Sequence, residues 1–286
     1  MNLLEETKFI LKKYGIKADK SLGQNFLIDE NVVDEIIYSA NISKEDVIIE
    51  IGPGLGTLTN KLLEKAGKVI AVELDKRMIN ILNDRFSTNE RFELINNDIL
   101  KVNINEIIEN NIKNDIKRAK IVANLPYYIT TPIIMKLLEE NLKIDSITVM
   151  IQKEVADRLV AIPGQKNTGA ITYSIYYYAE ANKVLEVLRN SFIPEPNVDS
   201  EVINLRIRNK PPVDVNNKEL LFKIIKYAFM QRRKTLVNAL ESSGIFKNKE
   251  EIINILSTIN IDEKIRGEAL TLEQFTKIAN FIVKNK

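Results

Sequence analysis

The sequence predicts an α/β protein in which a doubly wound, mostly parallel sheet is followed by a smaller all-α domain. Two observations support this fold class. Short, continuous apolar runs alternate with helical patterns from Val47 to Ile151, and such runs suit a parallel sheet that is covered on both faces. A charged, helically patterned region follows the linker Lys210-Pro211-Pro212. We therefore expect two domains, residues 1–209 and 210–286.

Strands and helices are expected in a regular order along the first domain. Apolar strands are predicted at 47–51, 68–73, 92–96, 121–123 and 147–151, with helices between them at 57–65, 77–86, 104–110 and 132–139. This alternation implies βαβ units with right-handed crossovers. Stretches at 173–179, 184–188 and 202–207 are expected to extend the sheet with an antiparallel edge. Helices are predicted at 218–241, 249–257 and 271–283 in the second domain.

The composition excludes several kinds of chemistry. The 286 residues include no cysteine and no histidine, which excludes disulfides and thiolate nucleophiles and removes the usual general base and the commonest metal ligand. We therefore expect no metal. No apolar run approaches the ~18 residues of a membrane helix, and the first residues mix acids with lysines. We expect a cytoplasmic protein that contacts no membrane and, since no feature requires a dimer, acts as a monomer.

A glycine-rich loop, Glu50-Ile51-Gly52-Pro53-Gly54-Leu55-Gly56-Thr57, follows the first predicted strand of the sheet. Its glycines stand at every second position instead of in the GxGxxG spacing of dinucleotide sites, and no Lys-Ser/Thr pair follows, which excludes a P-loop. Glycines at this place let the backbone approach a ligand at the carboxyl end of the strand. On its own the loop is equally well explained as a turn between a strand and a helix.

Two carboxylates end the next two predicted strands. Glu73 lies 21 positions after Gly52, a spacing typical of the carboxylate that binds ribose hydroxyls. Asp98 is placed to accept a hydrogen bond from an adenine amino group. Alone, Glu73 could be a surface residue and Asp98 a helix N-cap. Three such features at three successive strand ends favour a nucleoside cofactor.

The fourth strand leads into Asn124-Leu125-Pro126-Tyr127, which resembles the (N/D/S)-(hydrophobe/P)-P-(Y/F) signature of S-adenosylmethionine-dependent methyltransferases that act on exocyclic amino groups. More narrowly, the chain resembles the small-subunit (16S) ribosomal RNA adenine dimethyltransferases. The resemblance rests on the order and spacing of that tetrapeptide and of four further segments: Lys20–Leu27, Glu50–Thr57, Ser191–Ser200 and Gln231–Leu236.

The resemblance implies a Rossmann-like class I methyltransferase domain with S-adenosylmethionine as cofactor. Its substrate would be two adjacent adenosines near the 3′ end of 16S ribosomal RNA, within an assembling small subunit. Asn25 and Leu27 would form a lid over the cofactor, and Gly52 would contact its methionine part. Glu73 would bind the ribose and Asp98 the adenine amino group; Asn124 and Glu50 complete the expected contacts, Glu50 by orienting the loop or the methionyl ammonium.

The expected chemistry requires hydrogen-bond acceptors more than a base. An adenine amino nitrogen is a poor nucleophile, so an enzyme must favour the pyramidal nitrogen that forms during methyl transfer. The carboxamide oxygen of Asn124 and the carbonyl of Leu125 could accept the two amino hydrogens, in a loop that Pro126 stiffens. Tyr127 and Phe192 are candidates to stack on the extruded base. For Phe192 a role as a core-packed loop residue is almost as good an explanation.

The region from Arg206 to Lys234 is strongly basic, with nine lysine or arginine residues against two acidic ones, a local charge of +7 in a protein of net charge +2. The densest cluster, Arg232, Arg233 and Lys234, is expected on a helix. For an arbitrary run of charges, a solvated helical face is the better explanation. With the family resemblance we expect it to bind RNA phosphates.

Four other functions remain open from the sequence. A large-subunit (23S) adenine methyltransferase that confers antibiotic resistance would typically carry Ser and Lys in place of Pro53 and Leu55, and often Ile in place of Leu125. DNA adenine and protein glutamine methyltransferases commonly carry Pro in place of Leu125. A non-enzymatic RNA-binding assembly factor would not need the cofactor-site residues, which this chain retains.

Overall fold

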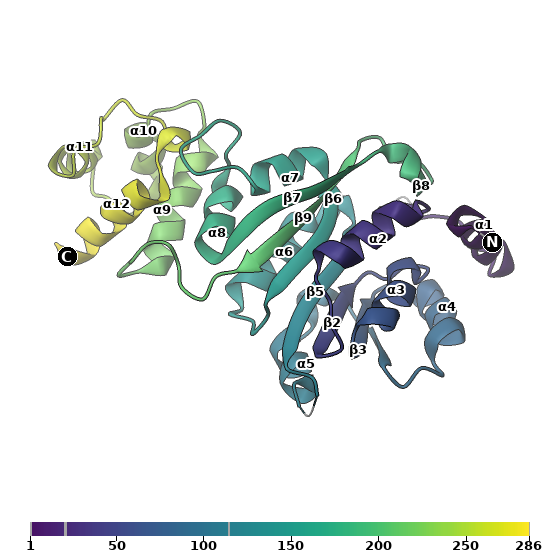
Figure 1. Cartoon of the computed structure of the whole chain (residues 1–286). Coiled ribbons are helices and arrows are strands. Elements are labelled where there is room, and N and C mark those ends of the chain that lie inside the picture. Colours follow the sequence, from purple (N-terminus) through teal and green to yellow (C-terminus); the bar gives the residue numbers. More distant parts are fainter. Residues whose placement is uncertain (1, 20–21, 114, 286) are drawn as a thin grey trace. The chain divides into compact units, whose positions relative to one another are not determined.

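A seven-stranded sheet dominates the computed structural model, which describes residues 2–19, 22–113 and 115–285 (Figure 1). The strand order is β4-β3-β2-β5-β6-β9-β7. The predicted α/β class with a mostly parallel sheet is confirmed. The strands are β2 (Asp46–Ile51), β3 (Lys68–Glu73), β4 (Phe92–Asn96), β5 (Arg118–Asn124), β6 (Ser146–Gln152), β7 (Ala179–Val187) and β9 (Ser200–Ile207).

The strand order reverses between β2 and β5. From β2 the chain proceeds outward through β3 to β4, then returns to the other side of β2 and continues through β5 to β6. These five strands are parallel, whereas β9 runs antiparallel to β6 as expected. The register pairs Ile51 with both Val72 and Ala123. The carboxyl ends of β2, β3 and β5 therefore meet at one edge, beside the topological switch point where such sheets bind ligands.

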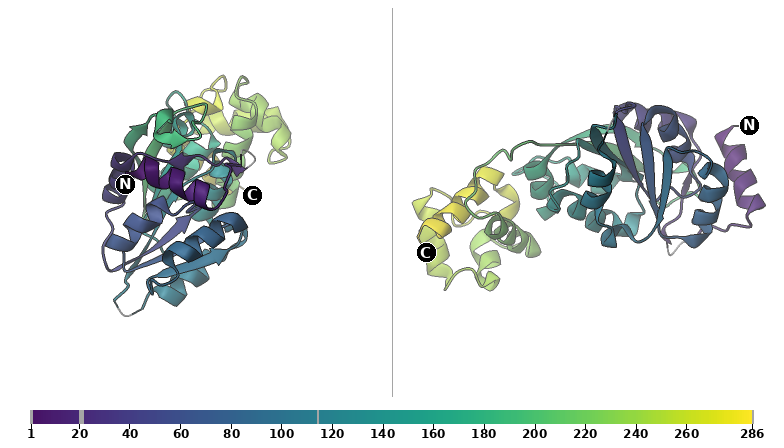
Figure 2. Two further views of the ribbon diagram at one scale, coloured as in Figure 1. Left: turned by 90° about the vertical axis from the view of Figure 1, so that its right-hand side faces the viewer. Right: turned by 90° about the horizontal axis from the view of Figure 1, so that it is seen from below.

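Helices cover both faces of the sheet (Figure 2). The helices of this part are α1 (Leu3–Lys13), α2 (Glu30–Ser39), α3 (Thr57–Lys65), α4 (Lys76–Phe86), α5 (Ile104–Asn111), α6 (Thr130–Glu139) and α7 (Lys153–Leu159). Helix α4 shows why they pack: its buried residues Met78, Ile81, Leu82 and Phe86 lie on one face at helical spacing. They join one core with residues of α1, α2, α3 and the facing side of the sheet.

A second, two-stranded sheet fastens the segment before α2 to the loop before β9. Strand β1 (Phe26–Leu27) pairs antiparallel with β8 (Phe192–Ile193). The backbone N–H of Ile28 continues this pairing by donating to the carbonyl of Ser191 at 2.9 Å. Two regions that lie far apart in the sequence are therefore joined at this place.

The chain divides into two compact units, and the second comprises Asp157–Glu180 and Arg208–Lys286. Its helices are α8 (Ala170–Tyr178), α9 (Lys218–Met230), α10 (Leu236–Leu240), α11 (Lys249–Thr258) and α12 (Leu272–Lys284). They enclose their own core around Tyr173 and Phe275. The unit thus includes residues 157–180, which the sequence analysis assigned to the first domain, because the aromatic face of α8 packs on the C-terminal helices.

Two predicted elements were wrong. Of the strand predicted at 173–179, residues 173–178 belong to helix α8 and only Ala179 begins a strand. The apolar and aromatic side chains of this stretch face the helical core on most sides, which hides the helical period. The helix predicted at 218–241 is broken, because Gln231 leaves the helical conformation and the Thr235 hydroxyl caps a new helix by accepting from the N–H of Asn238.

No helix among residues 2–19, 22–113 and 115–285 is both long and apolar enough to cross a membrane.

Candidate functional site

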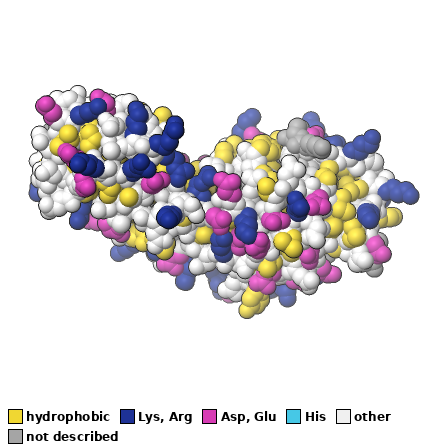
Figure 3. All heavy atoms as spheres, turned by 90° about the horizontal axis from the view of Figure 1, so that it is seen from above, with side chains coloured by type: hydrophobic (Ala, Val, Ile, Leu, Met, Phe, Trp, Pro, Cys, Tyr) yellow, Lys and Arg dark blue, Asp and Glu magenta, His cyan; other side chains and the backbone are white. Residues whose placement is uncertain are grey.

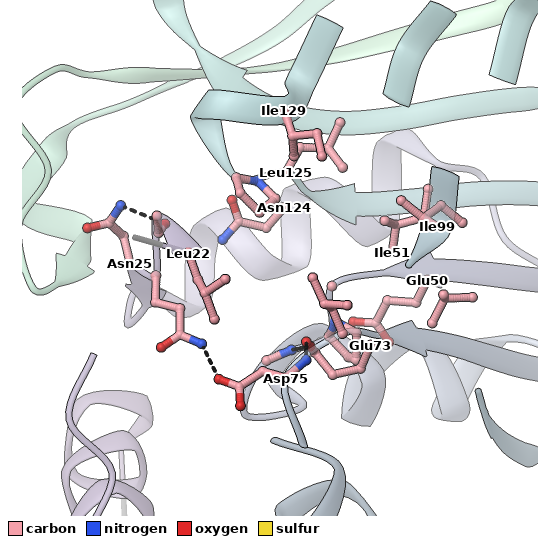
Figure 4. Close-up of a pocket in the computed structure, with 18 of the residues that line it drawn as sticks. Leu22, Asn25, Glu50, Ile51, Glu73, Asp75, Ile99, Asn124, Leu125 and Ile129 are labelled. Carbon is pink, nitrogen blue, oxygen red and sulfur yellow. Dashed lines mark hydrogen bonds between the residues drawn. The ribbon is translucent and has the colours of Figure 1, made fainter. Parts of the chain in front are cut away.

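A pocket lies at the carboxyl ends of β2, β3 and β5 (Figure 4). The structure brings every candidate residue of the α/β domain to its lining, although they come from six separate segments of the chain. These residues are Asn25, Leu27, Gly52, Glu73, Asp98, Asn124, Leu125, Pro126, Tyr127 and Phe192. The three candidate RNA-binding residues belong to the other unit.

The glycine loop can follow its path only without side chains at two positions. Gly56 has φ +83°, and a Cβ atom there would lie 2.5 Å from the Phe86 ring. Gly52 has φ +67°, in the left-handed region that glycine favours, but a Cβ atom there would meet no protein atom within 4 Å. The space beside Gly52 is thus left open where a cofactor's methionine part would approach the backbone.

Glu50 is a buried carboxyl group with one oxygen in use. The Thr59 hydroxyl donates to Oε2 at 2.6 Å, and no described group donates to Oε1, which is buried as well. Burial raises the pKa of Glu50 to about 8, against the opposing effect of the Thr59 hydrogen bond. An unpartnered carboxyl oxygen beside the glycine loop fits a cationic ligand group such as an ammonium.

Glu73 ends β3 and is held by the backbone around it. Its Oε2 accepts from the N–H of Gly54 at 3.2 Å and its Oε1 from the N–H of Asp75 at 2.8 Å. Burial raises the pKa of Glu73, opposed by these hydrogen bonds. Because a carboxylate oxygen has two lone pairs, each can still accept from a ribose hydroxyl.

Asp98 combines the two roles that the sequence allowed. It is the N-cap of a short 3₁₀ helix, and its Oδ1 accepts from the N–H of Leu100 at 3.0 Å. It also lines the pocket, where no hydrogen bond among the described residues uses its Oδ2. A structural cap and a ligand contact are therefore compatible in one carboxylate.

The segment before α2 crosses the pocket and is fastened at both ends. The Asp75 carboxylate accepts at Oδ2 from Nε2 of Gln24 at 2.8 Å, the contact drawn at Asp75 in Figure 4. Gln24 also accepts from the N–H of Asp19 at 2.9 Å. Arg77 donates to both carboxylate oxygens of Asp75. At the other end, β1 pairs with β8. Residues 20 and 21 of the predicted motif lie outside the described residues.

The tetrapeptide at the end of β5 presents two free acceptors. The N–H of Leu125 donates to the carbonyl of Met150, and the Thr130 hydroxyl donates to the carbonyl of Pro126 at 3.1 Å. None of the hydrogen bonds among the described residues uses the Asn124 carboxamide oxygen or the Leu125 carbonyl oxygen. The turn is thus held by its other polar groups.

The two candidate stacking residues differ in exposure. Tyr127 is half-buried, and its hydroxyl lies 2.7 Å from the hydroxyl of Ser200. Burial raises the pKa of Tyr127, which keeps the phenol neutral. Phe192 is only 3% exposed and packs in the core, with its backbone paired to Leu27. Phe192 is therefore a core residue, and it also lines the pocket.

The basic cluster lies in the turn between α9 and α10, not on a helix as predicted. Arg232 donates to the carbonyl of Thr168 at 3.0 Å and lies 3.5 Å from the Glu268 carboxylate, so it tethers the 161–168 loop. Arg233 and Lys234 are exposed and have no ion-pair partner among the described residues. They are the better candidates for phosphate contact.

Charge is distributed unequally between the two units. The helical unit has 17 lysine and arginine residues against 11 aspartate and glutamate residues, a net charge of +6. The α/β unit has the remaining 24 basic and 28 acidic residues, a net charge of −4. On the face seen in Figure 3, basic side chains gather on the helical unit. The excess of positive charge predicted from the sequence therefore belongs to a folded unit of its own.

Sequence reasoning missed the roles of three residues that support the pocket. Asp75 fastens Gln24, Thr59 hydrogen-bonds Glu50, and Ser200 hydrogen-bonds Tyr127. The position of Asp75, an N-cap type two residues after Glu73, was a usable signal. Partners across 51 or 73 positions of sequence leave no such pattern. Among the described residues no group of three or more acidic side chains is placed to hold a metal ion.

Comparison with known proteins agrees with this geometry. The family model "Ribosomal RNA adenine dimethylase" matches residues 15–284. The chain is 50% identical over 276 residues to ribosomal RNA small subunit methyltransferase A of Clostridioides difficile (96% of this chain, 94% of that protein). It is 49% identical over 280 residues to the protein of that name from Bacillus pumilus (97% and 96%).

A solved structure shows that this likeness extends to the fold. The crystal structure of a dimethyladenosine transferase from Plasmodium falciparum superposes with a TM-score of 0.76 at 28% identity, covering 91% of this chain and 98% of that one. A match by the family model over nearly the whole chain, together with relatives at half identity, establishes the family. The chain belongs to the ribosomal RNA adenine dimethylase family.

Proposed function

We propose that this protein transfers methyl groups from S-adenosylmethionine to the exocyclic amino groups of two adjacent adenosines near the 3′ end of 16S ribosomal RNA, as a step in assembly of the small subunit. The observation that carries the proposal is the pair of free acceptors at Asn124 and Leu125, on the lining of the pocket at the strand ends. Membership of the family supports the reaction, and the names of the relatives support the substrate.

The residues of the pocket fit the cofactor part by part. Bound S-adenosylmethionine supplies an electrophilic methyl group on a sulfonium. The open space beside Gly52 and the free oxygen of Glu50 suit the methionine part and its ammonium. Glu73 is placed for the ribose and Asp98 for the adenine amino group. Asn25 and Leu27, on the segment that crosses the pocket, would cover the bound molecule.

Asn124 and Leu125 would act on the target amino group. Their oxygens accept its two hydrogens and so favour the pyramidal nitrogen whose lone pair attacks the methyl carbon. The acceptors need no reorganisation during the reaction, since Leu125 N–H, Pro126 and Thr130 hold the turn in place. After transfer the nitrogen loses a proton to solvent, so the site needs no strong base. Orientation of nitrogen and methyl carbon supplies much of the acceleration.

Tyr127 and Phe192, which both line the pocket, would receive the extruded base. Stacking on an aromatic side chain stabilises an unstacked base by ~1 to 3 kcal/mol. Tyr127 is the more accessible of the two and therefore the main stacking candidate. The basic helical unit, with Arg233 and Lys234 exposed and Arg232 holding their turn, would bind RNA phosphates. We further infer that the protein acts as a monomer and works in the cytoplasm, where ribosomes assemble.

The test is transfer of labelled methyl groups from S-adenosylmethionine to small subunits that lack the modification, with large-subunit RNA and DNA in parallel. We expect two adjacent N6,N6-dimethyladenosines in the small subunit. Label confined to large-subunit RNA would instead indicate a 23S adenine methyltransferase of the kind that confers antibiotic resistance. Tight cofactor binding without label in any of these nucleic acids would overturn the proposal.

A further inference from the structure

We propose that Ser200 is a positioning residue that orients Tyr127 for the target base. The Ser200 and Tyr127 hydroxyl oxygens are 2.7 Å apart, although the residues lie 73 positions apart in the sequence. Ser200 is fully buried and Tyr127 is half-buried, so the contact is partly shielded from solvent. The inference rests on the proposed role of Tyr127 in base stacking and adds a residue to it.

Ser200 is part of the rigid sheet, whereas Tyr127 lies in a short turn. Ser200 begins β9 and pairs with Gln152 of β6. The preceding residue, Asp199, accepts from the N–H of Lys153 at 3.0 Å and, through its carboxylate, from the N–H of Arg189 at 2.9 Å. The Ser200 hydroxyl is therefore a fixed point, to which the far end of the Tyr127 ring is tied.

With its Cβ atom and its hydroxyl both held, the Tyr127 ring keeps one direction of its long axis. Without the hydroxyl contact, the half-buried ring of Tyr127 would adopt several side-chain conformations. Only a fraction of these would place the ring correctly for the base. The same segment, Phe192–Ser200, also carries the second candidate stacking residue, whose backbone is held by Leu27. One stretch of chain therefore places both aromatic faces of the base subsite.

Loss of the contact should affect RNA and not the cofactor. A neutral hydrogen bond contributes ~0.5 to 1.5 kcal/mol, so we expect Ser200→Ala to lower kcat/KM for the RNA by about 2- to 12-fold. Affinity for S-adenosylmethionine should stay unchanged. Because a loosely held base leaves sooner, the share of monomethyladenosine among the products should rise.

Three further variants separate positioning from a structural role. Tyr127→Phe removes the other half of the contact, so the double variant with Ser200→Ala should be no worse than Tyr127→Phe alone. Ser200→Thr keeps a hydroxyl and should restore most of the activity. Thr148→Val is the matched control, since Thr148 is fully buried in the same strand pair and accepts from Asn204 at 2.8 Å, away from the pocket. It should lower stability and leave the RNA kinetics unchanged.

The decisive measurement is the kinetic double-mutant cycle on small subunits, with a separate spectroscopic readout. In protein labelled with [4-¹³C]tyrosine, the Tyr127 ring carbon, assigned by its loss in Tyr127→Phe, should shift in Ser200→Ala whether or not RNA is methylated. Two results would overturn the proposal. One is a wild-type kcat/KM for RNA in Ser200→Ala. The other is an equal loss of kcat/KM on adding Ser200→Ala to the wild type and to Tyr127→Phe. An unmodified small subunit with wild-type protein would instead count against the proposed function alone.

Discussion

Alanine in place of Gly52 should weaken cofactor binding at a modest cost in stability. An L-residue at φ +67° costs ~1 to 2 kcal/mol, and the added methyl meets no protein atom within 4 Å. The free energy of unfolding should therefore fall by about that amount. The methyl would occupy space that the cofactor's methionine part needs, so affinity for S-adenosylmethionine should fall by about tenfold or more, since each 1.4 kcal/mol of steric cost is a factor of ten.

Two other glycines provide matched controls for this variant. Gly15 has φ +62° and likewise open space, so Gly15→Ala should lose the same stability as Gly52→Ala but keep cofactor affinity. Gly56→Ala adds a clash, because its methyl would lie 2.5 Å from the ring of Phe86, which Leu82 and the core hold in place. Overpacking should cost it a further ~1 to 3 kcal/mol.

Urea unfolding and titration calorimetry with S-adenosylmethionine measure the two quantities separately. The expected order of stability loss is Gly15→Ala equal to Gly52→Ala and both smaller than Gly56→Ala. Normal cofactor affinity in Gly52→Ala would refute the assignment of the open space to the cofactor. Equal destabilisation by all three variants would refute the steric argument at Gly56.

Four other variants test the remaining site residues. Glu50 has a folded pKa of about 8, above its ordinary value, so the folded protein keeps a proton that the unfolded chain releases; stability without cofactor should fall as pH rises from about 4.5 to about 8, and urea unfolding of Glu50→Gln should lack this pH dependence. Asn124→Ala should lower kcat by ~10²- to 10³-fold, as loss of one transition-state acceptor does, with cofactor affinity within a few-fold; near-normal turnover in a single-turnover assay would contradict its role. Neutralising Arg233 and Lys234 together should flatten the salt dependence of RNA binding by about two phosphate contacts without loss of stability. Arg232→Ala should also lower the melting temperature, because it breaks the contacts with Thr168 and Glu268. An unchanged slope in filter-binding titrations would assign the cluster to a solvated surface.

The helix-breaking turn at 231–235 illustrates where periodicity fails. Apolar residues continue at helical spacing through both α9 and α10, so the pattern predicts one helix. The break depends on the Thr235 cap and on the N–H of Leu236, which donates to the carbonyl of Ile265 at 2.7 Å. Residue 265 is a partner that no local pattern reveals. The change from strand to helix at 173–179 has a similar cause, since burial among other helices removes the polar face that marks a helix.

The sequence by itself determined the fold class and the composition of the pocket. Parallel strands end at one edge of a sheet, so Gly52, Glu73, Asp98 and Asn124, which follow successive strands, had to converge once the strands alternated with helices. The short spacings within each motif determined the positions of the other pocket residues.

Only the tertiary structure decided how those residues are held and which are free. The Ser200 contact with Tyr127, the Gln24 contact with Asp75 and the unpartnered oxygen of Glu50 depend on side chains brought together by packing. Packing likewise ties Arg232 to Thr168 and leaves its neighbours exposed. Local spacing encodes which face or edge a residue occupies. Contacts across long stretches of chain arise from the packing of whole elements, which leaves no periodic mark in the sequence.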